Sequence, residues 1–368
     1  MSGPPSRRRI LIAGGGTGGH LMPALAIATA LREHTPEVEP VLVGAVRGVE
    51  ARILPTRDFR YYLLPSEPIY RRTWWRNARW PLVAARLLRD VGKLFAAERP
   101  AAVLGTGGYA SAPVVWWAAR RGIPTAVQEQ NAYPGLATRW LSRRVRHVYL
   151  GLPEARRLLR FGAHTEVFDT GNPITPPAHE RRAQALARFG LDGRRPVVLV
   201  TGGSQGALAI NRAVAEWLRQ GGPRDADLLW VTGRGTHAEF AAAHKPPAVQ
   251  VIDFLDPMAD GYAVADLVVS RAGMITVAEL CAWGLPSILI PLPTAAADHQ
   301  THNARVLAEA GASLLLGQQQ LSGATLGEAV QGLLGDDARR SAMAGRALAR
   351  GRPRAAAEIV SKLLTLAR

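Results

Sequence analysis

The first residues of chemical interest are the five glycines and the histidine of "GGGTGGH", Gly14 to His20. The segment follows a short apolar run and precedes a helical pattern that begins with Pro23. Backbone N–H groups of such a loop can approach an anion, and the start of a helix disfavours a protonated imidazole. A neutral His20 could therefore accept a proton from a hydroxyl nucleophile. Alternatively, His20 is a helix cap or a packed ring.

A second candidate anion site is "SRAGMITVAEL", residues 270–280. The pattern predicts a strand that ends at Ser270, a glycine turn, and a helix that opens near Ile275. The N–H groups of the turn and the helix dipole suit a diphosphate. Glu279 lies about one turn into the helix, where its carboxylate could accept hydrogen bonds from two adjacent ribose hydroxyls. Alternatively, Glu279 only stabilises the helix dipole.

Other polar segments also follow expected strands. "DHQTHNA" (298–304) offers donors and acceptors for sugar hydroxyls, or else Asp298 caps a helix with a solvated polar face. "GTGGYAS" (105–111) and "QEQN" (128–131) end two strands of the first half. The acidic "DAD" (225–227) precedes a strand and is interpreted as a surface loop. We therefore expect no metal site and no cofactor.

Short runs rich in Val, Ile and Leu alternate with helical patterns along the chain. This alternation predicts parallel sheets covered on both faces, and it occurs twice, each time opening with a strand and a glycine-rich turn. The expected fold class is α/β, with two Rossmann-like, doubly wound parallel-sheet domains facing a cleft. The expected domains are 1–170 and 171–349, with the proline-rich segment 171–180 as linker and a C-terminal helix of about 350–368 packing back on the first domain.

The composition narrows the setting and the partners. The single cysteine, Cys281, excludes a disulfide framework and indicates a reducing, cytoplasmic environment. No apolar run reaches the ~18 residues of a spanning helix. The net charge of +16 is uneven, because residues 1–171 hold 25 Lys and Arg against 12 Asp and Glu, and residues 172–368 hold 20 against 17. The first half is therefore expected to meet an anionic partner.

Two common nucleotide-binding patterns fit poorly. Gly14, Gly16 and Gly19 match G-x-G-x-x-G, but the second strand ends in Gly44 without the acidic residue that would hold a dinucleotide ribose. The P-loop pattern G-x-x-x-x-G-K-[ST] is missing from the sequence. NAD binding and NTP hydrolysis are therefore disfavoured.

The motifs taken together resemble a specific family. "GGGTGGH", "GTGGYAS", "EQN", "GNP", "GGSQGA", "SRAGMITVAE" and "HQTHNA" occur in the order and spacing of the peptidoglycan N-acetylglucosaminyltransferases, and the resemblance covers nearly the whole chain. It implies a GT-B fold and a metal-independent, inverting transfer of N-acetylglucosamine. The donor would be UDP-N-acetylglucosamine, and the acceptor the C4 hydroxyl of undecaprenyl-diphospho-N-acetylmuramoyl-pentapeptide.

The resemblance also implies roles for individual residues. His20 would be the catalytic base, Glu279 would hold the ribose, and Phe254 and Leu255 would border the uracil. The residues implied in binding UDP-N-acetylglucosamine are Thr17, Gly18, Gly19, Asn131, Ser204, Phe254, Leu255, Arg271, Gly273, Met274, Ile275, Thr276, Glu279 and Gln300. Thr17 and His20 would border the acceptor, whose side of the cleft would further include Gly15, Gly16, Gly107, Gly108 and Tyr109.

The sequence departs from the family pattern at two positions. The arginine that usually follows "GNP" and meets the diphosphate is replaced, because this chain reads Ile174-Thr175. A compensating positive charge could come from Arg181, Arg182 or Arg271. Gln128 stands where a histidine often precedes "EQN", and we expect this change to be tolerated.

A basic aromatic segment indicates how the chain meets a lipid acceptor. Residues 69–95 combine Trp74, Trp75 and Trp80 with leucines and arginines, as suits the headgroup region of an anionic membrane. Trp116, Trp117 and Trp140 could extend this face. The expected location is the cytoplasmic face of the cell membrane, with peripheral attachment. Alternatively, the segment is a packed helix with a basic outer side.

Two other functions remain open at this point. One is a glycolipid synthase of the same fold that glycosylates diacylglycerol. The other is a non-catalytic protein that binds nucleotide or nucleic acid with its basic half. Nucleic-acid binding would require aromatic residues interleaved with basic residues on a defined module, whereas the tryptophans here cluster with leucines. We therefore expect no nucleic-acid partner.

Overall fold

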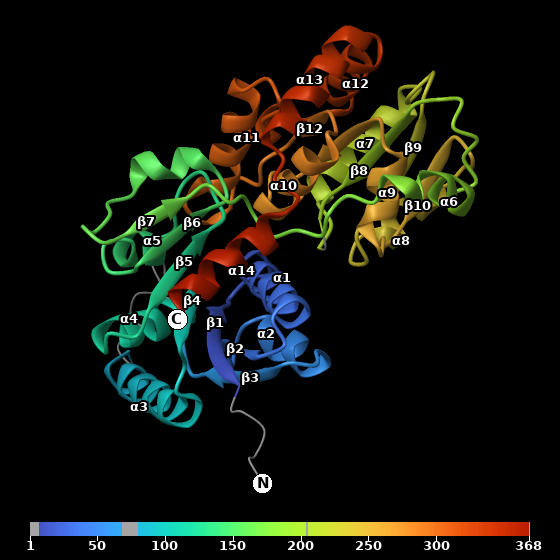
Figure 1. Ribbon diagram of the computed structural model, residues 1–368. Coiled ribbons are helices and arrows are strands. Elements are labelled where there is room, and N and C mark those ends of the chain that lie inside the picture. Colours follow the sequence, from blue (N-terminus) through green and yellow to red (C-terminus); the bar gives the residue numbers. More distant parts are fainter. Residues whose placement is uncertain (1–6, 68–79, 204, 368) are drawn as a thin grey trace. The chain divides into compact units, whose positions relative to one another are not determined.

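The computed structural model describes residues 7–67, 80–203 and 205–367 (Figure 1). The chain divides into two compact units, Met1–Ile174 with Arg354–Arg368, and Thr175–Pro353. Each unit holds one parallel sheet with helices on its faces, so the predicted fold class of two doubly wound domains is confirmed. The division at Ile174/Thr175 lies inside the proline-rich segment 171–180.

The first unit is built on a seven-stranded parallel sheet with the order β3-β2-β1-β4-β5-β6-β7. Its strands are β1 (Arg8–Gly14), β2 (Val38–Ala45), β3 (Arg60–Leu64), β4 (Ala102–Gly107), β5 (Thr125–Glu129), β6 (His147–Leu150) and β7 (Glu166–Phe168). Its helices are α1 (Gly18–His34), α2 (Glu50–Ile53), α3 (Trp80–Glu98), α4 (Ser111–Arg120), α5 (Leu136–Leu141) and α14 (Ala355–Leu366).

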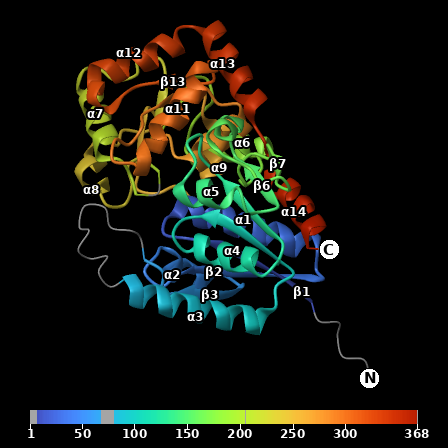
Figure 2. The ribbon, with the colours of Figure 1, turned by 90° about the vertical axis from the view of Figure 1, so that its left-hand side faces the viewer.

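Both faces of this sheet are buried. Ile10 and Ile12 of β1 point to a core that includes residues of α1 and α14. Leu11 and Ala13, which alternate with them, point to a second core with residues of α3, α4 and α5. Figure 2 shows α3 and α4 side by side on this second face. The continuous apolar sequence of β1 follows from this double burial.

The C-terminal helix α14 belongs to the first unit although it follows the whole second unit in sequence. Its residues Ile359, Val360 and Leu363 are buried in the core that contains Ile27 and Leu31 of α1. The chain therefore returns to the first unit at Arg354, a few residues from the expected start of this helix at about 350.

The second unit is built on a six-stranded parallel sheet with the order β10-β9-β8-β11-β12-β13. Its strands are β8 (Val197–Thr201), β9 (Asp227–Val231), β10 (Val249–Ile252), β11 (Leu267–Ser270), β12 (Ser287–Leu289) and β13 (Leu314–Leu315). Its helices are α6 (Arg182–Arg188), α7 (Leu208–Arg219), α8 (His237–Phe240), α9 (Met258–Val264), α10 (Met274–Trp283), α11 (His299–Glu309), α12 (Gly323–Leu334) and α13 (Asp337–Arg350).

Three details differ from the sequence expectations. The first helix begins at Gly18 rather than Pro23, so His20 is its third residue. The first three residues of this helix, Gly18, Gly19 and His20, have low helix propensity, so the sequence pattern did not indicate where the helix begins. The short strands β3, β7 and β13 were not expected, because they are only two to five residues long and mostly half-exposed. Asp227, expected in a surface loop, is buried at the start of β9 and pairs with Arg195 at 3.2 Å.

In each sheet the strand order reverses at one point, between β1 and β4 in the first unit and between β8 and β11 in the second. The carboxyl ends of strands flanking such a reversal are where open α/β sheets bind ligands. The glycine segments 14–20 and 105–111 follow β1 and β4, and the segments 201–207 and 270–280 follow β8 and β11. The fold therefore places all four motifs at the two ligand-binding edges.

Candidate functional site

The loop after β1 is held by a carboxylate that sequence reasoning missed. Glu50 is completely buried, and its Oε1 accepts hydrogen bonds from the Gly16 N–H at 2.8 Å and from the Ala45 N–H at 2.9 Å. A Cβ at Gly15 would lie 1.9 Å from Oε1 of Glu50, so only glycine allows this approach. Glu50 lies a few residues after the second strand, and no local pattern marks it as the partner of the glycine loop.

His20 lies against the loop that follows β4. A Cβ at Gly107 would come within 2.6 Å of Nδ1 of His20, and a Cβ at Gly108 would collide with the Gly15 carbonyl. Both glycines have positive φ angles, +98° and +79°, which residues with a side chain rarely adopt. These two glycines let the β1 and β4 loops meet around the imidazole. Thr17, Gly18 and Gly19, the residues just before it, are exposed.

The contacts of His20 determine which ring nitrogen is basic. Nδ1 lies 3.2 Å from the Thr106 carbonyl oxygen and 3.2 Å from Oε1 of Gln130. The amide NH₂ of Gln130 donates to the Thr106 carbonyl at 2.6 Å, so its Oε1 faces the ring as an acceptor. Two acceptors at Nδ1 require an Nδ1–H, and a neutral imidazole then has Nε2 as its basic nitrogen.

The side chain of Gln130 is hydrogen-bonded to a network of buried amide side chains. Its Nε2 also donates to Oε1 of Gln128, whose own Nε2 donates to Oδ1 of Asn172 at 2.8 Å. Asn172 returns a hydrogen bond from Nδ2 to the Gln130 carbonyl at 3.0 Å. Gln128, the residue that replaces the usual family histidine, is thus a buried link in this network.

Tyr109 and Asn131 complete the edge of the first sheet. A Cβ at Gly16 would lie 2.5 Å from the Tyr109 ring, which therefore packs on the glycine loop. Oε1 of the buried Glu129 accepts from the Asn131 backbone N–H at 3.1 Å and from its Nδ2 at 3.3 Å. The fold thus brings together His20, Tyr109 and the glycines predicted for the acceptor side.

In the second unit, two turns flank the reversal of the sheet. After β8, the Gly206 N–H donates to the Gly203 carbonyl at 2.9 Å, and Ser204 between them lies outside the described residues. After β11, Gly273 is the N-cap of α10, and Met274, Ile275 and Thr276 form its first turn. Because the cap has no side chain, the first N–H groups of α10 are available to an anion.

Glu279 lies on α10 and is tied to α9. The Tyr262 hydroxyl donates to its Oε2 at 2.9 Å. Burial raises the pKa of Glu279 to about 7, while the Tyr262 hydrogen bond acts in the opposite direction. Sequence reasoning missed Tyr262, which is 4% exposed and has no periodic signal to separate it from a core residue.

The residues expected at the uracil differ in exposure. Leu255 is buried, and a Cβ on Gly261 of α9 would lie 2.6 Å from its side chain. Phe254 is 37% exposed, and the Arg234 guanidinium carbon lies 4.4 Å from its ring centroid. An exposed aromatic ring at the edge of the second sheet can pack against a nucleobase.

Gln300 and Arg271 both bind the segment after β12. Oε1 of Gln300 accepts from the Leu292 N–H at 3.0 Å. The Arg271 guanidinium donates to the carbonyls of Ile290 and Pro291, both at 3.1 Å, and to Oε1 of Gln318 at 2.7 Å. Burial lowers the pKa of Arg271. Arg271, which directly follows β11, is therefore hydrogen-bonded to the segments that follow β12 and β13.

The other arginines considered for the missing diphosphate contact are also engaged. Arg181 forms an ion pair with Asp260 at 2.6 Å. Arg182 donates to the Ala263 carbonyl at 2.9 Å and lies 3.6 Å from Asp266. All three arginines considered as substitutes for the missing charge at Thr175 are therefore bound to other protein groups.

The basic aromatic face is described only in part. Trp74 and Trp75 lie outside the described residues, whereas Trp80 begins α3 and is partly buried. Leu82 on α3 is 75% exposed, and Leu136 and Trp140 on α5 are 60% and 45% exposed. The Arg144 guanidinium stacks on Trp140, 4.8 Å from the ring centroid.

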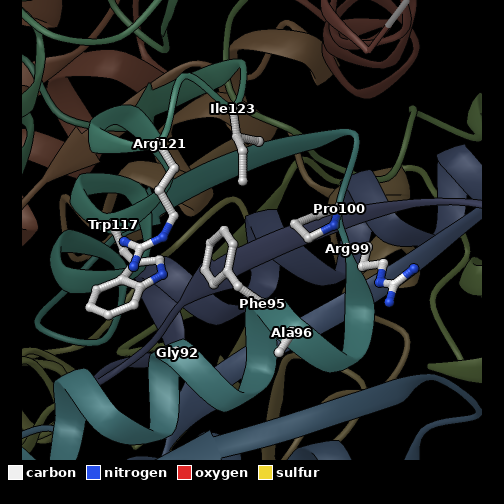
Figure 3. A pocket seen from close by; sticks show the side chains of 8 residues that line it. All are labelled: Gly92, Phe95, Ala96, Arg99, Pro100, Trp117, Arg121 and Ile123. Atoms are coloured by element: carbon white, nitrogen blue, oxygen red, sulfur yellow. The ribbon is translucent and has the colours of Figure 1, made fainter.

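A cavity of about 530 Å³ opens between the C-terminal parts of α3 and α4 (Figure 3). Phe95 points into it, Pro100 and Ile123 border it, and the Arg121 guanidinium lies 3.7 Å from the Trp117 ring centroid. The lining combines apolar side chains with two exposed arginines, Arg99 and Arg121.

Among residues 7–67, 80–203 and 205–367, no helix is long and apolar enough to cross a membrane. Within the same ranges, no group of three or more His, Cys, Asp or Glu side chains is placed to hold a metal ion.

Comparisons with known proteins match both units. The model of the glycosyltransferase family 28 N-terminal domain matches residues 10–150, and that of the family 28 C-terminal domain matches residues 197–359. A protein of Chlorobaculum parvum is 39% identical over 98% of this chain and 100% of its own length. A protein of Moorella thermoacetica is 37% identical over 97% of this chain and 98% of its own. Both are named UDP-N-acetylglucosamine--N-acetylmuramyl-(pentapeptide) pyrophosphoryl-undecaprenol N-acetylglucosamine transferase.

Solved structures also match nearly the whole chain. The crystal structure of MurG from Acinetobacter baumannii aligns with a TM-score of 0.78 and 26% identity, covering 98% of this chain and 99% of that chain. A calicheamicin glycosyltransferase aligns with a TM-score of 0.67 and 18% identity, covering 98% of both chains, which shows likeness of fold.

Proposed function

The chain belongs to glycosyltransferase family 28, and from this membership we propose that it transfers N-acetylglucosamine from UDP-N-acetylglucosamine to undecaprenyl-diphospho-N-acetylmuramoyl-pentapeptide. It is a glycosyltransferase with a GT-B fold. The observation that carries the specific substrates is identity of 36–39% over nearly the full chain with relatives named for this transfer. The motifs that resemble this family lie at the ligand-binding edges of both sheets.

In this reaction His20 acts as the base. Nε2 accepts the proton of the muramoyl C4 hydroxyl while the oxygen forms a bond to the anomeric carbon of N-acetylglucosamine. The bond from that carbon to the UDP oxygen breaks, UDP leaves with the electron pair, and the anomeric configuration inverts. The Thr106 carbonyl and Gln130 support this role because they keep the ring proton on Nδ1.

The donor binds to the second unit. The diphosphate accepts hydrogen bonds from the first turn of α10, at Gly273 to Thr276, where the helix dipole favours negative charge. Glu279 accepts from the ribose hydroxyls, Phe254 and Leu255 border the uracil, and Gln300 meets the sugar. The residues of the first unit that the family resemblance assigns to UDP-N-acetylglucosamine are Asn131 and the exposed turn from Thr17 to Gly19.

Release of UDP from UDP-N-acetylglucosamine tests this assignment. We expect release that depends on the undecaprenyl-linked muramoyl acceptor. Release with diacylglycerol in its place would identify the glycolipid synthase instead. Nucleotide binding without release in the presence of either acceptor would identify a non-catalytic protein.

Chelation gives a prediction about the chemistry. We expect EDTA to leave the transfer rate unchanged, because the dipole of α10 rather than a divalent ion stabilises the departing diphosphate. The rate is measured with and without EDTA on the same enzyme preparation. A loss of activity that magnesium restores would contradict the metal-independent mechanism.

For the membrane, we propose peripheral attachment to the cytoplasmic face through α3, α4 and α5. The support is the exposure of Leu82, Leu136 and Trp140 on a unit whose sequence carries most of the positive charge. Arginines beside the aromatic rings, such as Arg121 on Trp117, can bind anionic headgroups while the rings enter the interface.

This surface predicts the effect of a double substitution. Replacing Leu82 and Trp140 with serine should weaken binding to anionic vesicles by roughly tenfold or more, since each side chain contributes apolar area at the interface. Flotation with anionic and neutral vesicles measures the binding, and high salt should release the protein from anionic vesicles because salt screens the attraction.

A matched control uses an exposed leucine of the second unit. Leu348 on α13 is 56% exposed, and Leu348→Ser should leave vesicle binding unchanged. The double variant should keep activity on a short-chain soluble acceptor. Equal binding of the unmodified protein to neutral and anionic vesicles would refute the membrane proposal.

A further inference from the structure

Tyr262 and Glu279 form a buried pair that joins two helices of the second unit. The Tyr262 hydroxyl on α9 donates to Oε2 of Glu279 on α10 at 2.9 Å. Tyr262 is 4% exposed, and its ring centroid lies 6.1 Å from that of Trp283 on α10. Packing therefore restricts the phenol, and the phenol in turn restricts the carboxylate.

The hydrogen bond has a defined direction. Burial raises the pKa of Tyr262 well above 10, so the hydroxyl keeps its proton at neutral pH and acts as the donor. One acceptor position on Oε2 is then occupied, and the plane of the carboxylate is constrained. The remaining acceptor positions of Glu279 can each accept from a hydroxyl of a vicinal diol.

We propose that Tyr262 is a positioning residue for the donor site, which orients Glu279 so that the carboxylate accepts from both ribose hydroxyls of UDP. This inference rests on the proposed function, because it requires UDP at the edge of the second sheet. It adds a residue that acts through Glu279 without contacting the nucleotide.

Charged and titratable groups also lie on the elements that pack around the pair. Asp260, also on α9, is paired with Arg181 and with Arg188 of α6. The His179 ring packs against Trp283, with 4.8 Å between the ring centroids. The other titratable group on α10 is Cys281, whose pKa is raised by burial and lowered to a smaller extent by the charge of Arg350 on α13. Next to α10, α11 carries His299, His302, Arg305 and Glu309. The pKa of Glu279 is raised by burial, the larger effect, and lowered by the Tyr262 hydrogen bond.

These two effects on the pKa of Glu279 predict that the affinity for UDP depends on pH. Burial raises the pKa of Glu279 to about 7, so protonation removes an acceptor as pH falls through that value. The Tyr262 hydrogen bond lowers the pKa, and Tyr262→Phe should raise it further. In the variant, the loss of ribose recognition on acidification should therefore begin at higher pH, by roughly one unit.

The experiment is titration calorimetry of UDP and of 2′,3′-dideoxy-UDP between pH 6 and pH 9. The quantity compared is the ratio of the two dissociation constants, in which the titration of the nucleotide phosphates cancels. In the unmodified protein the ratio should be about ten- to a hundredfold at high pH and should fall towards one below about pH 7. In Tyr262→Phe the midpoint of this fall should move upward.

Tyr149→Phe is the matched control. Tyr149 is a fully buried tyrosine of the first unit whose hydroxyl is bonded to Nδ1 of His147 at 3.0 Å, so the control loses a buried hydroxyl far from Glu279 in sequence and in a different unit. Its midpoint should match that of the unmodified protein. Thermal unfolding of each variant reports whether it is folded.

Glu279→Gln provides a second variant, which keeps an acceptor for Tyr262 but does not titrate in this range. Its ratio should be independent of pH, and a ratio that still falls near pH 7 would overturn the inference even if Tyr262→Phe does not fold. An unchanged midpoint in folded Tyr262→Phe would also overturn it. Failure of the unmodified protein to bind UDP at all would instead refute the proposed function.

Discussion

Replacing His20 with alanine should lower kcat by about 10²–10⁴-fold, the range that general bases contribute. In the proposed reaction, the substitution removes the Nε2 atom that takes the proton of the attacking hydroxyl and leaves the proposed donor site of the second unit untouched. UDP affinity should therefore remain nearly unchanged. Steady-state kinetics with the lipid acceptor and calorimetry with UDP measure the two effects separately.

His164→Ala is a suitable control, because this exposed histidine lies on the first unit and is not part of the candidate site. It should retain full turnover. If His20→Ala also retains nearly full turnover, another group is the base, and the contacts of Nδ1 with Thr106 and Gln130 only orient a packed ring.

Replacing Glu279 with alanine should weaken UDP binding by about ten- to a hundredfold, which corresponds to the ~1.5–3 kcal/mol of hydrogen bonds to a charged group. The same loss should appear in the KM for UDP-N-acetylglucosamine. Because the ribose does not react, kcat at saturating donor should change much less. Calorimetry with UDP at pH 8, where Glu279 is ionised, gives the clearest comparison.

The control for this prediction is Glu309→Ala, since Glu309 is an exposed carboxylate at the end of α11 in the same unit. Its UDP affinity should equal that of the unmodified protein. Unchanged affinity in folded Glu279→Ala would show that this carboxylate only stabilises α10, the alternative that the sequence left open.

The sequence by itself determined the fold class and the family. The alternation of Val-, Ile- and Leu-rich runs with helical patterns is local, and double burial of parallel strands such as β1 requires it. The glycine turns at 14–19 and 202–206 and the start of α10, expected near Ile275 and observed at Met274, are also local signals, because backbone geometry and helix ends depend on neighbouring residues. Short edge strands such as β7 carry too little pattern to be seen.

Only the tertiary structure decided how the candidate site residues are held. Glu50 reaches back to the Gly16 N–H across 34 positions, Gln130 reaches His20 across 110, and these contacts leave no periodic trace in the sequence. The tautomer of His20 depends on which atom of Gln130 faces it, and the ionisation of Glu279 depends on burial and on Tyr262. The physical reason is that hydrogen-bond direction and desolvation arise where chain segments meet. Residue type and spacing identify the groups that can react, and packing sets their protonation and orientation.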